Sequence, residues 1–168
     1  MNNENDVFLD RIACFMSGKE DAAEYFENND VSMQFLYACY QSGDRGLKAE
    51  VLNYVEGEMN PGIIVDACPE FAELLIDEAD EFTLIYLFES FKAREMFPQA
   101  LKCLKNILGF HTIANGRGEN SCESYDGDDN CIIALKYLSE YYSEGKGAEK
   151  DEKLAKYYKA LADSFEKQ

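Results

Sequence analysis

The sequence contains no tryptophan, only one histidine and only three prolines among its 168 residues. Hydrolases of the Ser-His-Asp or Cys-His type need a histidine to move the proton, and His111 is the one histidine available. Neither a G-x-S-x-G motif nor a G-x-x-x-x-G-K-[ST] phosphate-binding motif occurs. These absences predict a protein that is not an enzyme, with no catalytic residue, no cofactor and no metal ion.

Basic residues are also scarce, since 16 Lys and Arg stand against 33 Asp and Glu, and the net charge is −17. Binding to nucleic acid or to an anionic membrane requires Lys and Arg to neutralise phosphates, so we expect neither. A strongly negative surface favours solubility, and it also speeds association with a basic protein partner. Both explanations of the charge stay open at this point.

Long apolar runs are missing as well. No stretch approaches the roughly 18 consecutive apolar residues of a membrane-spanning helix, and the first residues lack the basic and apolar regions of a secretory signal. We therefore predict a cytoplasmic protein. Four of the six cysteines lie in apolar, helix-like runs, where buried reduced thiols are expected: Cys14, Cys39, Cys68 and Cys103.

Apolar residues recur at helical spacing through almost the whole chain, and no segment shows a convincing strand period. This pattern predicts an all-α fold, an array of antiparallel helix hairpins in a single domain over residues 1–168. The expected helices span residues 4–17, 20–28, 31–42, 45–58, 62–67, 70–79, 81–94, 97–109, 130–144 and 150–166.

Three of these helices share a pattern. Segments 31–40, 82–91 and 133–142 align without gaps at offsets of 51 residues. The alignment superimposes Leu36, Leu87 and Leu138, and places an aromatic residue four positions after each. Residues four apart lie on one face of a helix, so we expect these positions to be buried.

Residues 110–129 interrupt the helical pattern with glycine, amide and acidic side chains, and we predict an acidic irregular loop. Other interpretations are a zinc site formed by His111, Cys122 and Cys131, or a disulfide between the two cysteines. The spacing of the cysteines is not that of a zinc knuckle, so a plain solvated loop is preferred.

The closing segment, residues 133–166, resembles a Sel1-like repeat, a relative of the tetratricopeptide repeat. Ser139 supplies a small residue between two helices, Gly145 and Gly147 permit a sharp turn, and Asp151 can cap the second helix. The other matching residues are Ala134, Leu138, Tyr142, Glu152, Lys153, Ala155, Tyr157, Tyr158 and Ala162. The resemblance implies an α-solenoid-like arrangement and a protein-binding role without enzyme activity.

Charge and resemblance together predict a protein–protein interaction protein. The first hypothesis is an acidic inhibitor of the immunity type, which binds and neutralises a basic toxin or effector domain. Its expected partner-binding carboxylates are Asp77, Glu78, Asp80, Glu81, Glu119, Glu123, Asp126, Asp128 and Asp129. The alternative is a Sel1-like adaptor that holds a protein or peptide in signalling or secretion, for which the net charge is incidental.

Overall fold

The computed structural model describes residues 4–115 and 122–166, and this part of the chain is all-α apart from one short β-hairpin. Most predicted helices are found within two residues of their expected ends. The largest difference is α6 (Pro69–Leu75), which ends before the predicted residue 79. Ile76 and Ala79 continue the apolar pattern and are buried, but they lie in the turn that follows the helix. No helix in the described ranges has the length and apolar character needed to cross a membrane.

Contacts between residues group the chain into two compact units, Met1–Ala72 and Glu73–Gln168. The division falls inside the short helix α6. Its physical basis is visible in the aromatic residues, which form separate clusters: Phe15, Phe26 and Phe35 pack in the first unit, and Phe88 and Tyr141 pack in the second.

Four helices of the first unit begin at a side-chain cap. Asp21, Ser32, Asp44 and Asn60 each accept a hydrogen bond from a backbone N–H of the helix that follows, which satisfies a donor that the helix leaves free. The helices are α1 (Glu4–Met16), α2 (Ala22–Asn28), α3 (Met33–Gln41), α4 (Arg45–Glu58) and α5 (Pro61–Ala67).

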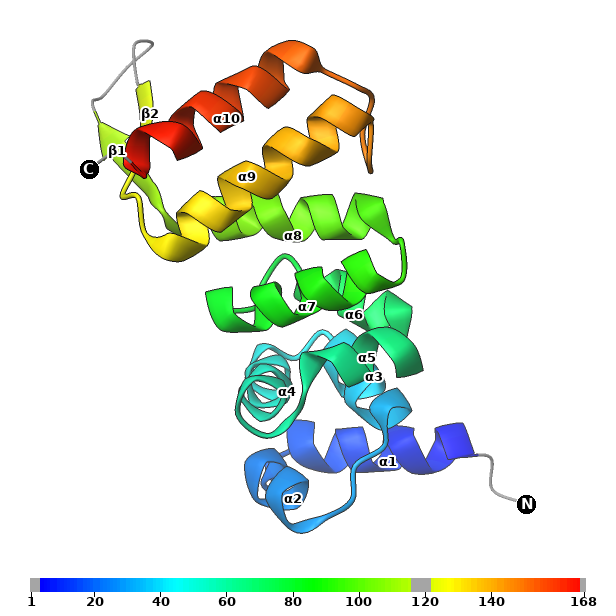
Figure 1. The fold of residues 1–168 in the computed structure, drawn as a ribbon. Coiled ribbons are helices and arrows are strands. Elements are labelled where there is room, and N and C mark those ends of the chain that lie inside the picture. The colour runs from blue at the N-terminus through cyan, green and yellow to red at the C-terminus, as the bar shows by residue number, and fades with distance from the viewer. Residues whose placement is uncertain (1–3, 116–121, 167–168) are drawn as a thin grey trace. The chain divides into compact units, whose positions relative to one another are not determined.

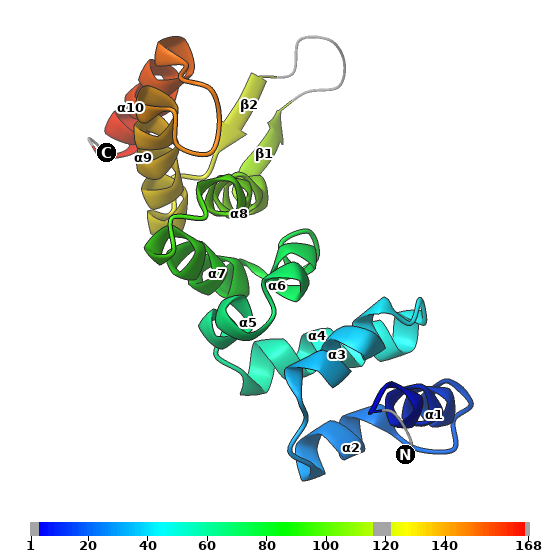
Figure 2. The ribbon, with the colours of Figure 1, turned by 90° about the vertical axis from the view of Figure 1, so that its right-hand side faces the viewer.

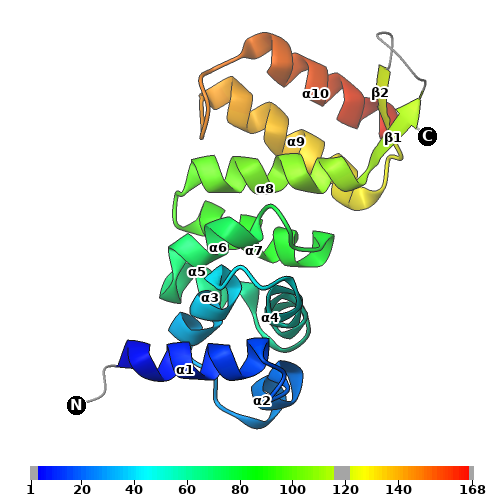
Figure 3. The same ribbon diagram turned by 180° about the vertical axis from the view of Figure 1, so that it is seen from behind.

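The second unit contains four helices of 13 to 16 residues that alternate in direction (Figures 1 and 3). They are α7 (Glu81–Ala93), α8 (Phe97–Phe110), α9 (Asp129–Glu144) and α10 (Glu152–Phe165). Figure 1 shows that α7 and α9 begin at the end of the unit where α8 stops. This alternation brings three helix termini to one place.

The positions aligned at 51-residue offsets are buried, as the sequence predicted. Leu36, Leu87 and Leu138 lie on α3, α7 and α9, and each is fully inaccessible to solvent. The aromatic residues four positions later are also buried, namely Tyr40, Phe91 and Tyr142. The pattern therefore marks the core-facing side of these helices.

Residues 110–129 require a correction, because they are not wholly irregular. β1 (Thr112–Asn115) and β2 (Cys122–Tyr125) form an antiparallel pair in which Thr112 is opposite Tyr125 (Figure 2). Four residues per strand are too few for a two-residue period to be recognised in the sequence, which explains why the prediction missed them. The hairpin extends from the end of α8 and returns the chain to the start of α9.

The predicted closing helix pair is present as α9 and α10. Gly145 and Gly147 have φ angles of 76° and 73°, in the left-handed region that favours glycine. Asp151 caps α10 by accepting hydrogen bonds from the backbone N–H groups of Lys153 and Leu154. The predicted turn and cap are both confirmed.

The two glycines of this turn differ in their surroundings, which gives a test. A Cβ on Gly147 would lie 2.3 Å from the carbonyl oxygen of Phe97, whereas the nearest atom to a Cβ on Gly145 is 3.6 Å away. We expect Gly145→Ala to lower the free energy of unfolding by about 1 kcal/mol, from backbone strain alone. Gly147→Ala should cost about 1–3 kcal/mol more, from the added clash. Urea denaturation followed by circular dichroism measures both, and equal losses would contradict the close approach to Phe97.

Candidate functional site

His111 is the centre of a polar cluster in the second unit. It follows the last residue of α8 as its C-cap, and it is one of two buried polar residues in the described chain, the other being Thr83. The ring has a hydrogen-bond partner on both sides, because each ring nitrogen faces a carboxylate from a different segment. A histidine at this position therefore links separate parts of the unit.

Asp126 and Glu81 are the two carboxylates. His111 Nδ1 lies 3.0 and 3.1 Å from the carboxylate oxygens of Asp126, and Nε2 lies 2.9 Å from Oε1 of Glu81. Glu81 is the first residue of α7, and Asp126 follows β2. Ionised carboxylates only accept hydrogen bonds, so a ring protonated on both nitrogens satisfies both contacts. The geometry suits an imidazolium between two carboxylates.

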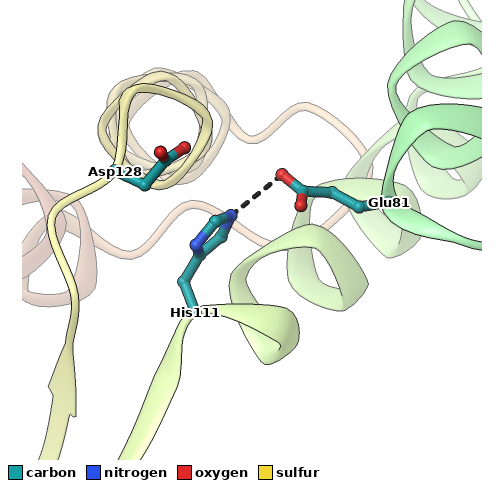
Figure 4. Close-up of side chains that lie close together, drawn as sticks. All are labelled: Glu81, His111 and Asp128. Carbon is teal, nitrogen blue, oxygen red and sulfur yellow. Dashed lines mark hydrogen bonds and ion pairs between the residues drawn. The ribbon is translucent and has the colours of Figure 1, made fainter.

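The start of α9 completes the cluster. Asp128 caps α9 through the backbone N–H of Asn130, at 2.9 Å. The side-chain amide of Asn130 donates to Oε1 of Glu81 at 2.7 Å, the same oxygen that faces His111. The backbone N–H of Asp128 donates to Asp126 at 3.0 Å. The starts of α7 and α9 and the end of α8 are therefore joined by hydrogen bonds through side chains (Figure 4 shows Glu81, His111 and Asp128).

The electrostatics of the cluster favour a protonated His111 and an ionised Asp126. Burial opposes protonation of His111, but the hydrogen bonds to Asp126 and Glu81 and their negative charges outweigh it, and the pKa is raised above its ordinary value of 6.5. The pKa of Asp126 is lowered, first by the hydrogen bond from the backbone of Asp128 and then by His111. A ring that donates from both nitrogens has no lone pair for general base chemistry in this arrangement.

The structure brings together some of the carboxylates predicted to bind a partner. Glu81, Asp126 and Asp128 belong to the His111 cluster, and Asp80 caps α7. Asp129 is exposed in the first turn of α9. Asp77 pairs with Lys102 at 2.6 Å, and Asp77 and Glu78 line a groove of about 520 Å³. Glu119 lies outside the described residues, and of Glu123 only the backbone position in β2 is described.

Sequence reasoning missed the role of His111, which it treated as a loop residue. The acidic residues that follow His111 were the one signal of a hydrogen-bond partner for the ring, because Glu81 is 30 positions away in the sequence. The zinc site considered in the sequence, with His111, Cys122 and Cys131 as ligands, does not match the residues that surround His111 in the structure. Cys131 is a buried free thiol with a raised pKa, caused by burial, and the side chain of Cys122 lies outside the described residues. Cys39, Cys68 and Cys103 are buried and free as predicted, and Cys14 is free and half-buried.

An acidic groove lies between α2 and α4 in the first unit. Its volume is about 260 Å³, and its lining includes the carboxylates of Glu27, Glu50 and Glu58. The half-buried Tyr54 contributes aromatic surface, and its ring packs against the buried ring of Phe26 with centroids 5.5 Å apart. No Lys or Arg is among the described residues that line it. A carboxylate-rimmed groove with an aromatic wall suits a cationic side chain, through ion pairing and cation–π contact.

An apolar surface is exposed on the second unit. Phe82 and Tyr86 lie one turn apart on α7, and their rings meet edge to face with centroids 4.7 Å apart. Both are exposed, at 59% and 42%, and Ile133 of α9 is exposed at 49%. The hydrogen bond between Glu81 and Asn130 places the starts of these two helices next to each other. Exposed aromatic residues are typical of surfaces that bind other proteins.

Comparison of the chain with family models, with characterised proteins and with solved structures finds no match.

The His111 cluster predicts a pH dependence of stability. Because the pKa of His111 is raised in the folded state, the protonated imidazole stabilises the fold. This contribution is complete below pH 6.5 and is lost as the pH rises through the folded-state pKa. Because the pKa of Asp126 is lowered in the folded state, its ionised carboxylate also stabilises the fold. This contribution is complete above pH 3.8 and is lost as the pH falls through the folded-state pKa. We therefore expect both contributions to be complete only between pH 3.8 and pH 6.5.

Thermal melts of the wild type and of His111→Gln between pH 4 and pH 9 test this prediction. The difference in melting temperature between the two proteins should be largest in mildly acidic buffer and should shrink toward pH 9. A difference that stays constant or grows with pH would contradict the charged cluster.

Proposed function

We propose that this chain is a non-enzymatic, cytoplasmic, protein-binding protein, and most concretely an acidic inhibitor of the immunity type. It binds a basic toxin or effector domain and blocks that domain sterically and electrostatically. The observation that carries the proposal is the acidic groove between α2 and α4, where three glutamates and the half-buried Tyr54 line a space without a basic residue among its described lining.

The distribution of charge along the chain supports this proposal. Residues 1–72 hold 14 Asp and Glu against four Lys and Arg, a net charge of −10, whereas residues 73–168 hold 19 against 12, a net charge of −7. Carboxylates pair with basic residues in both units, and in the first unit Glu20 pairs with Arg11. Asp77 pairs with Lys102, Glu89 with Lys92, and Glu140 with Lys146. A basic partner therefore meets more uncompensated charge on the first unit.

The carboxylates predicted from sequence take a smaller part in this proposal. Asp129 and Glu78 stay candidates for contact with a partner. Glu81 and Asp126 already neutralise His111, and recruiting them for a partner would cost the interactions that join the helix ends. We assign the electrostatic recognition chiefly to Glu27, Glu50 and Glu58, with Tyr54 beneath a lysine or arginine side chain of the partner.

The first experiment captures a partner from the native host with the full chain as bait, and identifies it by mass spectrometry. The proposal expects a basic domain whose toxic or enzymatic activity falls when this chain is added. A partner whose activity is unchanged, or whose binding does not respond to ionic strength, would contradict inhibition by charge complementarity.

A charge-matched pair of variants then localises the surface. Glu27→Gln/Glu50→Gln/Glu58→Gln should weaken the complex by about tenfold or more, equivalent to about 1.4 kcal/mol, and should reduce its salt dependence. Asp10→Asn/Asp66→Asn/Glu70→Gln removes the same charge from exposed positions of the same unit, away from the groove. Isothermal titration calorimetry at two salt concentrations compares them. Equal losses would assign the effect to net charge and not to the groove.

The exposed apolar surface favours a second candidate function, a Sel1-like adaptor that holds a peptide or protein. Phe82 and Tyr86 would contact the ligand in that case, and charge would be incidental. Phe82→Ser/Tyr86→Ser would abolish binding to the captured partner, while the triple glutamine variant would bind normally. The opposite pattern favours the inhibitor, so one set of titrations separates the two functions.

A further inference from the structure

We propose that Glu81, His111 and Asp128 form a binding site for one divalent transition-metal ion of the zinc type. One ligand atom from each side chain can be chosen so that all three lie within 4.8 Å of one another. They come from the start of α7, the end of α8 and the cap of α9, and Figure 4 shows them gathered in one place. Zinc sites with open positions commonly use three protein ligands drawn from histidine and carboxylate.

The neighbours of these residues are arranged as outer partners of a metal site. A metal-bound histidine usually donates its other ring N–H to a carboxylate, which fixes the ring. Asp126 accepts from His111 Nδ1 at 3.0 Å, which leaves Nε2 as the nitrogen directed at Glu81. Asn130 in turn holds the Glu81 carboxylate at 2.7 Å. A divalent ion would take the place of the proton on Nε2.

The local charge also calls for a cation. Three carboxylates, those of Glu81, Asp126 and Asp128, surround one histidine, and no Lys or Arg of the described chain is ion-paired with any of them. Even with His111 protonated, the cluster carries an excess of negative charge. An ion of charge +2 supplies the missing compensation, and attraction to it is strengthened where water is partly excluded.

The burial of the three ligands permits entry of an ion. The His111 side chain is 8% exposed, whereas that of Glu81 is 29% exposed, and Asp128 lies at the surface. The imidazole nitrogen favours zinc, cobalt or nickel over magnesium and calcium, which prefer oxygen ligands alone. Three protein ligands leave a fourth position for water. The bound ion would join the ends of three helices, adding to the hydrogen bonds that already connect them.

Titration of the full chain with Zn²⁺ and Co²⁺ tests this site, after removal of metals by chelation. Calorimetry should show one site per chain. The Co²⁺ spectrum should show ligand-field bands without the charge-transfer band of a thiolate ligand, which would place the ion on a cysteine and overturn the assignment.

Variants that keep the hydrogen-bonding capacity of the cluster separate ligation from folding. Asp128→Asn can still cap α9, and Glu81→Gln can still accept from Asn130. Each should weaken Zn²⁺ binding by at least the roughly 10–100-fold expected for loss of an outer partner such as Asp126. Asp129→Asn is the matched control, because it removes the adjacent exposed carboxylate outside the group. Binding that is absent from the wild type, or equal in Asp128→Asn and Asp129→Asn, would overturn the proposal. Circular dichroism confirms that each variant is folded.

Discussion

The pairing of His111 with Glu81 and Asp126 is the interaction on which the second unit depends. Helices that alternate in direction bury their sides against one another, but their ends carry free backbone groups and need other partners. Here the ends of three helices meet at one imidazole ring, buried at 7% exposure, and exchange hydrogen bonds with it and with Asn130. Because the polar groups satisfy one another, the histidine can be buried without a large penalty. The cost of removing one member is correspondingly large, since it leaves a partner unsatisfied.

The same arrangement limits what the site can do. A carboxylate that is hydrogen-bonded to a buried histidine is less available to a protein partner, so two sets of acidic residues differ in their surroundings. Glu81 and Asp126 are paired with His111. Glu27, Glu50 and Glu58 line a groove without a basic residue among its described lining, and they are the carboxylates to which recognition of a partner is proposed. Net charge alone does not distinguish the groups, because it counts a paired carboxylate and an unpaired one equally.

Much of the fold could be predicted from sequence, because helix period and capping residues are local signals. Arg45–Glu58 begins and ends at the predicted residues, and Leu36, Leu87 and Leu138 are buried as their spacing required. The candidate site could be predicted only in part. Asp126 and Asp128 stood out as acidic residues near His111, but Glu81 approaches through tertiary packing, for which a single sequence offers no pattern. The grouping of contacts into two compact units also has no counterpart in the sequence, because apolar residues recur along the whole chain.

The β-hairpin has a consequence for how this chain can vary. Its base is closed twice, by the pairing of Thr112 with Tyr125 and by the backbone bond from the N–H of Asp126 to the carbonyl of His111 at 3.2 Å. Helices α8 and α9 are thus already connected before the chain reaches the tip of the hairpin. Lengthening a loop whose ends are fixed adds little entropic cost, about 0.6 kcal/mol for each doubling. The hairpin is accordingly a place where residues can be added at little cost to the two helices that flank it.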